Sequence, residues 1–426
     1  MSARNRELVH LVVVGVLVGT AFASAYIARR EVVDTSSISY GLFFLGLYVV
    51  AHVVARLTVP NADPYLLPMA GLLTGIGLTE IYRLDEDDAF RQGLWIVFGL
   101  GAFAASLFVL RRDYRRLEGF KYLFGLGAIA LLVLPVVPGI GATVNGARLW
   151  ADIGPLQFQP GELAKIFLIV FLAGYLREKR EVLAQFRLKD LGPLFLIWGG
   201  AMLVLVQTND LGGGLLYFGI FLAMLYVATA QVWFVVAGTA LFVGGAAVVY
   251  TQIPRIQDRV DIWRDPWSDP YGSGYQTAQS LYSIANGHFG GTGFGRGTFT
   301  DPDGNPLIPH VNTDFIFSAL AQELGLVGTA AFLLVYMLIA ARGFRIAMLA
   351  QDGFSKLLAV GLTFCFTLQT FIIVGGVLRL IPLTGITLPF VSYGGSSIVA
   401  NFILLAGLLL VSDRANAGAR RGGDSP

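Results

Sequence analysis

The chain has 426 residues, of which 55% are hydrophobic and 14% are charged. A mean hydropathy of +0.68 and this scarcity of charge exclude an ordinary soluble domain, in which about a quarter of the residues are charged. The formal net charge is +2 and no dense basic block occurs, so nothing indicates a nucleic-acid partner. The single cysteine, Cys365, excludes an intrachain disulfide and is expected to be a small buried hydrophobic residue.

Apolar runs of roughly twenty residues recur along the chain, and this is the length that a helix needs to cross a bilayer. They predict an all-α polytopic membrane protein with about twelve transmembrane helices and one large outer loop. The expected spans are residues 8–28, 37–58, 64–82, 92–110, 120–137, 161–176, 191–208, 212–230, 233–251, 314–341, 355–380 and 388–412.

The first apolar run also has features of a signal peptide, because Arg4 and Arg6 precede it and alanine pairs occur over 21–25. It ends at Arg29 and Arg30, however, and its length favours a membrane anchor.

Basic residues divide unequally between the two sets of connections, and they gather on the cytoplasmic side of membrane proteins. One set holds the Lys and Arg residues within 111–121, 177–189, 342–356 and 414–421. We therefore expect a multi-pass protein with both termini in the cytoplasm. The polar tail after Ser412 is expected to be flexible.

The connection from Gln252 to Asp314 differs from the rest of the chain, since it mixes charged residues with glycine, proline and aromatic residues. Structureless loops of this length are uncommon unless they are functional or disordered. Its many aromatic residues argue against disorder. The orientation places this loop outside, and we interpret it as a folded cap over a functional site.

Two carboxylates in this loop, Asp265 and Asp269, stand four residues apart and each precedes a proline. An aspartate before a proline commonly forms a turn, so a structural role for one of the two is the alternative to chemistry. The histidines His288 and His310 lie too far apart for a histidine metal motif, and no protein metal ligands are expected.

A second candidate region begins at Pro160, a residue suited to the first turn of a helix. Glu162 and Lys165 follow three residues apart, so they share one helix face and can pair. The pair is either structural or presents the Lys165 cation to an anionic head group. Arg148 lies on the same outer side and is a further candidate cation.

Other charged residues near the expected outer ends of the spans have more than one interpretation. Asp210 is either a helix cap or a site carboxylate. Glu323 is expected to be a packing or capping partner, whereas Arg379 is a further candidate for binding phosphate. Glu80 and the acidic run 85–88 are expected to lie in a solvated loop.

Several of these motifs occur in one order between about residues 64 and 412, and together they resemble the SEDS family of bacterial cell-wall proteins, which includes RodA, FtsW and a sporulation member. The matching stretches are Asn145–Arg148 with Trp150, Phe158–Lys165, Asp210–Gly212, Asp265–Pro270, Gly274–Gln276 with Gln279 and Ser280, Thr313–Phe317, Glu323–Gly325 and Leu388–Ser397.

The resemblance implies a peptidoglycan glycosyltransferase that polymerises lipid II on the outer face of the bacterial cytoplasmic membrane, in elongation or division. It implies a class B penicillin-binding protein as partner. Because the family core has ten spanning helices, residues 1–63 would carry two additional helices without an expected function, 64–412 the core and 413–426 the tail. At 301–309, Gly161 and Thr208 the sequence differs from the residues that are usual in the family. These differences leave open whether the protein is of the elongation or the division type, and the elongation type is favoured.

The family's essential loop aspartate corresponds to Asp269, which we expect to be the general base for the acceptor hydroxyl. Lys165 and Arg148 would stabilise the leaving pyrophosphate electrostatically. Arg259, Arg264 or a divalent cation (Mg²⁺ or Mn²⁺) would assist them, and the pyrophosphate oxygens would hold that cation. Single inversion at the donor sugar is expected. The residues expected to support the site are Glu162, Asp210, Asp265, Gln276, Thr313, Asp314 and Ser392.

Two other classes of function remain open. A lipid II flippase without catalysis would also use a polar intramembrane pair such as Glu162 and Lys165, and it predicts that Asp269 is dispensable for polymer synthesis. A scaffold that only recruits the penicillin-binding protein predicts that Asp269 and Lys165 both tolerate alanine.

Overall fold

Helices form nearly all of the regular structure. The computed structural model describes residues 2–31, 36–144, 147–154, 156–181, 192–300 and 306–422. The motif residues Asn145 and Gly146, the basic connection 182–191 and the segment 301–305 lie outside the described residues.

A helix coincides with each of the predicted spans. These helices are α1 (Ala3–Arg30), α2 (Ser36–Thr58), α3 (Leu66–Leu84), α4 (Glu86–Leu110), α6 (Lys121–Val133), α7 (Pro160–Glu178), α9 (Gly192–Gln207), α10 (Leu211–Thr229), α11 (Val232–Gln252), α14 (Ile316–Leu349), α15 (Gly353–Val377) and α16 (Gly395–Gly422). Within the described residues, 8 helices are long and apolar enough to cross a membrane by length and composition. The chain is therefore a multi-pass helical membrane protein.

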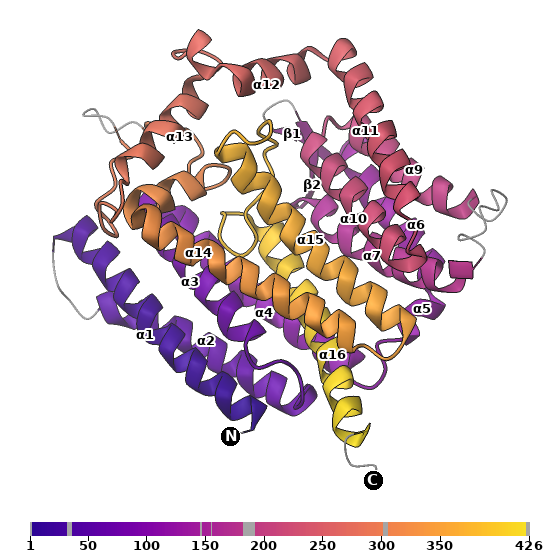
Figure 1. Cartoon of the computed structure of the whole chain (residues 1–426). Coiled ribbons are helices and arrows are strands. Elements are labelled where there is room, and N and C mark those ends of the chain that lie inside the picture. Colours follow the sequence, from indigo (N-terminus) through magenta and orange to yellow (C-terminus); the bar gives the residue numbers. More distant parts are fainter. Residues whose placement is uncertain are drawn as a thin grey trace.

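Several helix ends differ from the predicted ones, and the differences at α14 and α16 affect the candidate site and the tail. Helix α14 begins at Ile316, which leaves Asp314 outside the span. Helix α16 begins only at Gly395, so residues 388–394 form a connection, and it continues to Gly422 through most of the expected tail. The start of α1 and the end of α16 lie at one end of the bundle, and α12 (Pro254–Arg264) and α13 (Tyr275–Asn286) lie at the other (Figure 1).

A small antiparallel sheet stands between α6 and α7, where the sequence predicted only a connection. Its strands are β1 (Gly141–Val144), β2 (Ala147–Ile153) and β3 (Leu156–Phe158), in the order β1-β2-β3. Trp150 pairs with Ala142, and Ala151 pairs with Phe158. The sheet delivers the chain to the start of α7, where the Gln159 N–H donates to Ser396 Oγ (2.8 Å).

The outer loop is folded through much of its described length. It carries α12, a short 3-10 helix (Pro266–Ser268) and α13. Figure 1 shows α12 crossing the end of the bundle between α11 and α13. The end of α12 is fastened by Arg379, whose Nη2 donates to the carbonyl oxygens of Trp263 and Arg264 (both 2.8 Å), while Trp263 Nε1 donates to Arg379 O (3.0 Å).

Helix α14 is broken near its outer end, at Gly325, where φ is 65° and ψ is −173°. The backbone groups that the break leaves without helical partners pair with the segment 288–293 instead. Thr292 N donates to Gln322 O and Gly293 N to Glu323 O (both 3.0 Å), and Leu326 N donates to His288 O (3.0 Å). The part of the loop after α13 is thus hydrogen-bonded into α14.

We expect Gly325→Ala to destabilise the protein by about 3 kcal/mol or more, because this backbone conformation is almost restricted to glycine. In addition, a Cβ there would lie 2.1 Å from Gly291 N. Thermal unfolding in detergent measures the change. Gly101→Ala in α4, where a Cβ meets nothing within 4 Å, is the control and should not lower the melting temperature. Equal melting temperatures for the two variants would contradict the strain argument.

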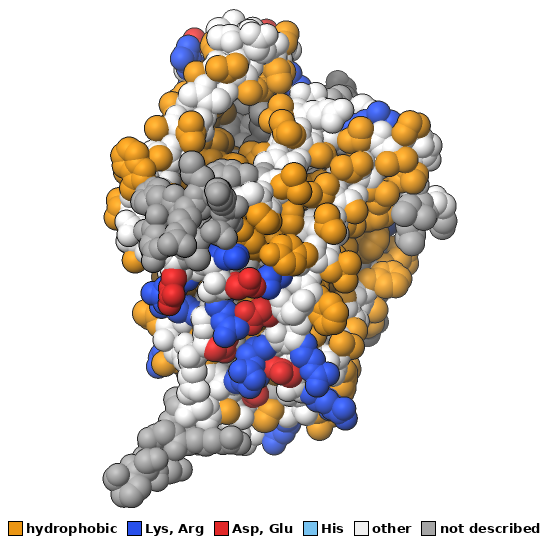
Figure 2. Space-filling model, turned by 90° about the vertical axis from the view of Figure 1, so that its right-hand side faces the viewer, with side chains coloured by type: hydrophobic (Ala, Val, Ile, Leu, Met, Phe, Trp, Pro, Cys, Tyr) orange, Lys and Arg blue, Asp and Glu red, His pale blue; other side chains and the backbone are white. Residues whose placement is uncertain are grey.

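The surface divides into an apolar part and a charged part. Figure 2 shows broad hydrophobic surface above a group of Lys, Arg, Asp and Glu side chains. Ion pairs on the connections predicted to be cytoplasmic include Lys121 with Glu178 (2.5 Å) and Arg414 with Asp113 (3.0 Å). Exposed apolar area on this scale suits a hydrocarbon environment.

Candidate active site

The Glu162–Lys165 pair predicted from its spacing is present and buried at the start of α7. Lys165 Nζ lies 2.6 Å from Glu162 Oε2 and 2.7 Å from Gln369 Oε1 of α15. The Lys165 side chain is 2% exposed. A buried ammonium group requires such partners, because an unpaired charge inside a protein is costly.

The polar contacts continue from Lys165 into the connection between α15 and α16. Gln369 Nε2 donates to Thr387 O (2.9 Å), and Thr387 Oγ1 donates to Ser397 Oγ (2.7 Å). Sequence reasoning missed Gln369 and Thr387. The available signal was a glutamine inside an otherwise apolar span, since polar side chains within spans are rare and often functional.

Three further predicted residues lie in the same polar neighbourhood, above the pair. Arg259 of α12 reaches down to donate to Thr384 O (3.2 Å). A Cβ on Gly385 would lie 3.5 Å from Asp314 Oδ2 and 3.9 Å from Arg259 Nη2, so both charged groups lie close to Gly385. Asp210 interacts electrostatically with both Glu162 and Arg259.

Two of these carboxyl groups have shifted pKa values. Burial raises the pKa of Asp210, although its hydrogen bond from Gly213 N (2.7 Å) opposes the shift. That bond also confirms Asp210 as the N-cap of α10. Burial raises the pKa of Asp314 to about 6, against the lowering effects of Arg259 and His310. Asp314 therefore holds its proton to a higher pH than an ordinary aspartate does.

A test follows from the Asp314 pKa. The folded-state pKa of about 6 lies above the ordinary aspartate value of 3.8, so the folded protein binds more protons than the unfolded chain between these pH values. Stability from this group is therefore lost as pH rises from about 4 to 6. We expect the melting temperature of Asp314→Asn to change less across this window than that of the wild type. Parallel pH curves for the two proteins would contradict the shifted pKa.

Asp265 and Asp269, in contrast, lie at the exposed rim of the outer loop. Asp269 Oδ2 accepts hydrogen bonds from Ser273 N (2.8 Å) and Ser273 Oγ (3.2 Å). Asp265 Oδ1 accepts from Trp267 N (3.1 Å) and caps the short 3-10 helix. Among the contacts of the described residues, none joins either aspartate to Lys165, so the structure does not bring the predicted base and cation together.

The remaining predicted residues surround this neighbourhood. Arg148 lies on β2, and its buried Nε has no hydrogen-bond partner within the described part of the chain. Arg264 is exposed and its carbonyl oxygen accepts from Arg379, while Gln276 is half-buried in the first turn of α13. The guanidinium of Arg379, the further candidate for binding phosphate, contacts the backbone carbonyls of Trp263 and Arg264.

Thr313 and Ser392 join two outer connections to each other. Ser392 Oγ donates to Thr313 O (2.6 Å) and accepts from Leu388 N (2.9 Å). These bonds hold the segment before α14, and with it Asp314, against the connection before α16. Both residues therefore hold these two connections together through uncharged groups.

Two acidic residues, Glu80 on α3 and Glu323 on α14, lie close to each other. Glu323 accepts from Gly295 N (2.8 Å) and Gly297 N (3.0 Å), so of the two predicted roles, packing or capping partner, it has that of a packing partner for the loop. The prediction that Glu80 lies in a solvated loop is wrong. Its side chain is fully buried beside Glu323 and Arg83, because α3 extends to Leu84 and turns this residue inward.

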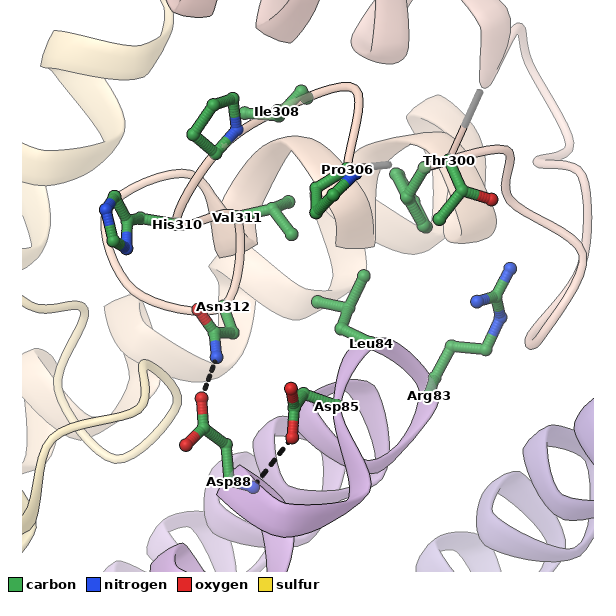
Figure 3. Close-up of a pocket in the computed structure, with 12 residues that line it drawn as sticks. Arg83, Leu84, Asp85, Asp88, Thr300, Pro306, Ile308, His310, Val311 and Asn312 are labelled. Carbon is green, nitrogen blue, oxygen red and sulfur yellow. Dashed lines mark hydrogen bonds between the residues drawn. The ribbon is translucent and has the colours of Figure 1, made fainter. Parts of the chain in front are cut away.

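A cavity of about 380 Å³ lies between the outer loop and the corner that joins α3 to α4. Figure 3 shows Arg83, Leu84 and Asp85 on one side and Pro306, Ile308 and Val311 on the other. Asn312 Nδ2 donates to Asp88 Oδ2 (2.6 Å) beside it. This contact fixes the end of the loop to α4. The residues that line the cavity include neither Lys165 nor its hydrogen-bond partners.

Comparisons with known proteins agree with this architecture. The family model described as "Cell cycle protein", for FtsW, RodA and SpoVE, matches residues 66–417. The chain is 40% identical to peptidoglycan glycosyltransferase RodA of Mycobacterium tuberculosis, over 99% of this chain and 92% of the relative. It is 35% identical to stage V sporulation protein E of Bacillus subtilis, over 83% of this chain and 97% of the relative.

Solved structures resemble the chain as well. A chain from a peptidoglycan synthase complex, studied for its coordination of polymerization and crosslinking, has a TM-score of 0.68 and 29% identity, over 83% of this chain and 98% of that one. The rod shape determining protein RodA of Thermus thermophilus has a TM-score of 0.60 and 27% identity, over 83% and 97%. The family match and the curated relatives together establish that the chain belongs to the FtsW, RodA and SpoVE family.

Proposed function

We propose that this protein is a peptidoglycan glycosyltransferase that polymerises lipid II at the outer face of the bacterial cytoplasmic membrane. The observation that carries the proposal is the buried Lys165 ammonium, held by Glu162 and Gln369. This arrangement suits a pyrophosphate head group whose prenyl chain stays in the bilayer. The relatives' names support glycosyl transfer over a flippase, and the mycobacterial ones favour the elongation type.

The chemistry needs one base and several cations. A pyrophosphate leaves readily once its charge is neutralised, which Lys165, Arg148, Arg259 and Arg264 would do electrostatically. Asp269 would remove the proton from the acceptor hydroxyl. Its Oδ2 is oriented by Ser273, whereas Oδ1 has no donor among the residues that the structure describes. One displacement inverts the donor carbon and forms no glycosyl-enzyme, so trapping such an intermediate would contradict this mechanism.

The setting of the proposal follows from the orientation and the relatives. Both termini lie in the cytoplasm, the outer loop faces the periplasmic or extracellular side, and residues 64–412 form the glycosyltransferase core. A class B penicillin-binding protein is the proposed partner, in line with a structural relative that belongs to a peptidoglycan synthase complex. Such a partner would cross-link the strands that this protein makes.

The direct test is to purify the protein with its penicillin-binding partner, add lipid II and a divalent cation, and separate the products on a gel. A glycan ladder is the expected result. If no ladder forms although both proteins are folded and associated, a lipid-flipping assay becomes the next experiment and the glycosyltransferase proposal fails.

A divalent cation would be carried by the substrate and not by the protein. Within the described residues, no group of three or more His, Cys, Asp or Glu side chains could hold a metal ion. We expect EDTA to reduce polymerisation by at least about tenfold, Mg²⁺ or Mn²⁺ to restore it, and the melting temperature of the substrate-free protein to stay unchanged. A melting temperature that falls with EDTA would point to a metal site in the protein.

A further inference from the structure

The first two helices lie outside the part of the chain that the family model matches, which begins at Leu66. The alignment with the mycobacterial relative spans 99% of this chain, whereas the solved structures cover 83% of it. Helix α1 packs against both α2 and α3, so the added pair is in contact with the family core. Nothing in the proposed chemistry uses these helices.

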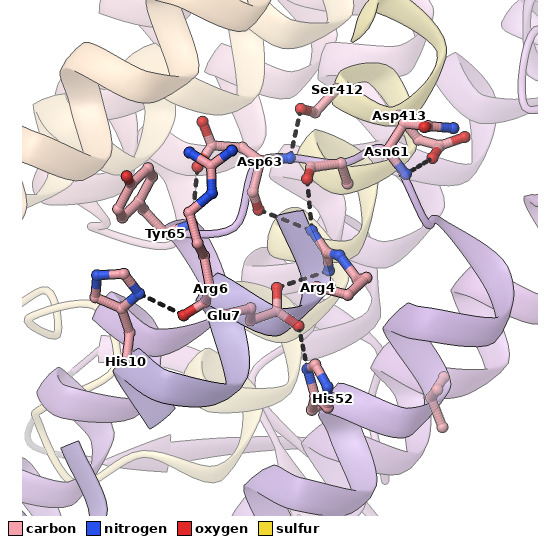
Figure 4. A network of polar contacts seen from close by, with 12 residues as sticks. Arg4, Arg6, Glu7, His10, His52, Asn61, Asp63, Tyr65, Ser412 and Asp413 are labelled. Atoms are coloured by element: carbon pink, nitrogen blue, oxygen red, sulfur yellow. Dashed lines mark hydrogen bonds and ion pairs between the residues drawn. The ribbon is translucent and has the colours of Figure 1, made fainter. Parts of the chain in front are cut away.

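The inner end of α1 is fixed by a buried polar network (Figure 4). Arg4 Nη1 lies 2.6 Å from Glu7 Oε2, and Glu7 Oε1 lies 2.7 Å from His52 Nδ1 of α2. Arg4 Nη2 also donates to Ala62 O (2.5 Å) in the connection to α3. These side chains are at most 4% exposed. Sliding α1 along its axis would separate buried charges from their partners, which is strongly unfavourable.

The same network continues to the end of the chain. Asp63 N donates to Ser412 Oγ (2.9 Å), and Asn61 N donates to Asp413 Oδ1 (2.6 Å) on α16. The depth of α1 is therefore set relative to the core helices, and so is the position of its outer end.

The outer end of α1 touches the loop that follows α13. Ser24 Oγ donates to Phe294 O (3.3 Å), and Arg29 Nη1 donates to Tyr82 O (2.8 Å) at the end of α3. Gly295 lies so close that a Cβ there would stand 2.6 Å from Ala28 Cβ. Helix α1 thus packs directly against the backbone at Gly295.

The opposite side of this loop segment is held by α3 and α14. Glu323 accepts from both Gly295 N and Gly297 N, at 2.8 and 3.0 Å. Arg83 donates to Gly297 O and lies 3.5 Å from Glu323 Oε1. The segment Phe294–Gly297 is consequently enclosed between α1 on one side and the Arg83–Glu323 pair on the other.

We propose that α1 is a positioning element for the outer loop: fixed in depth at its inner end, it presses Phe294–Gly297 against Arg83 and Glu323 and so sets the position of the loop that carries Asp269. The consequence for catalysis rests on the proposed function. Ala28 and Ser24 act through the loop and are positioning residues. A small displacement of reacting groups costs up to a hundredfold in rate, so loosening this contact should be visible in turnover.

The experiment uses two neighbouring glycines of the full-length protein with its partner. Gly293 and Gly295 both have positive φ, 94° and 83°, so alanine at either position brings backbone strain. A Cβ at Gly293 approaches only Arg296 Cδ, at 3.8 Å, whereas a Cβ at Gly295 meets Ala28. Gly293→Ala is therefore the strain control for Gly295→Ala. The double variant Gly295→Ala/Ala28→Gly removes the colliding methyl group from α1.

We expect Gly295→Ala to lower kcat by roughly tenfold more than Gly293→Ala with little change in KM, and Ala28→Gly to recover most of the loss. Hydrogen exchange of the backbone amides in 288–299 should follow the same order, fastest in Gly295→Ala and slower again in the double variant. Equal effects of the two glycine variants, with no recovery from Ala28→Gly in either measurement, would overturn the proposal.

The exchange measurement separates this proposal from the proposed function. If the wild type makes no polymer, the glycosyltransferase proposal fails, and the exchange data alone decide whether α1 positions the loop. Faster exchange in Gly295→Ala that Ala28→Gly relieves would support the contact. If hydrogen exchange in 288–299 responds to neither substitution, the proposal that α1 positions the loop is contradicted.

Discussion

Asp269→Ala is expected to abolish the glycan ladder, with a polymerisation rate at least about a hundredfold below that of the wild type. The reason is the loss of the base for the acceptor hydroxyl. The fold should survive, because Asp269 is exposed and its contacts within the described chain are local hydrogen bonds in its own turn, each contributing about 1 kcal/mol. Gel analysis of lipid II products, with melting temperature and partner binding measured in parallel, provides the test.

Two matched variants sharpen this experiment. Asp269→Asn can keep an oxygen facing Ser273 while it removes the base, so it should be as inactive as alanine. Asp258→Ala removes another exposed carboxylate, from α12 of the same loop, and should leave the ladder intact. A ladder from Asp269→Ala would move the base elsewhere, with Asp265 as the next candidate.

Lys165→Met should lower polymerisation by on the order of a hundredfold to a thousandfold, as expected for the loss of one preorganised group that stabilises a developing negative charge. This variant also leaves Glu162 buried beside an apolar side chain, and removal of one partner from a buried ion pair costs about 3–5 kcal/mol. The single variant alone therefore cannot separate chemistry from stability. Melting temperature and glycan synthesis must be read together.

The double variant Glu162→Gln/Lys165→Met makes the separation. It removes both charges, so most of the lost stability should return, while synthesis should stay low because the cation is still absent. Recovery of synthesis together with stability would show that the pair is structural. In that case Arg148 and Arg259 would become the principal candidates for binding the pyrophosphate.

The helical fold could be predicted because its signal is local. Every predicted span coincides with a helix, since a run of apolar residues long enough to cross a bilayer has few other stable conformations. The sheet at 141–158 was missed, because its strands have only 4, 7 and 3 residues, too few for a sustained alternating pattern. Glu80 was misplaced because its burial depends on Arg83 and on Glu323 of a distant helix.

The candidate site divides in the same way. Glu162 and Lys165 are three residues apart on one helix, so their pairing followed from helical geometry. Gln369, the other partner of Lys165, is 204 residues away, and no local pattern connects the two. The place of Asp269 relative to Lys165 depends on how α12 and α13 dock on the bundle. That arrangement is set by contacts such as Arg379 with Trp263, which involve residues far apart in the sequence.

The break in α14 has a consequence for suppressor genetics. A Cβ at Gly291 would lie 2.2 Å from Glu323 O and 2.7 Å from Gly325 N, and a Cβ at Gly325 would meet Gly291 N. At both positions an added Cβ would collide with main-chain atoms, which are present whatever residue occupies the neighbouring position. No second-site change of side chain can therefore make room. Gly295 differs, because its nearest obstacle is the methyl group of Ala28. In a saturation library, lesions at 291 and 325 should yield only true revertants, whereas lesions at 295 should also yield compensating alleles in α1.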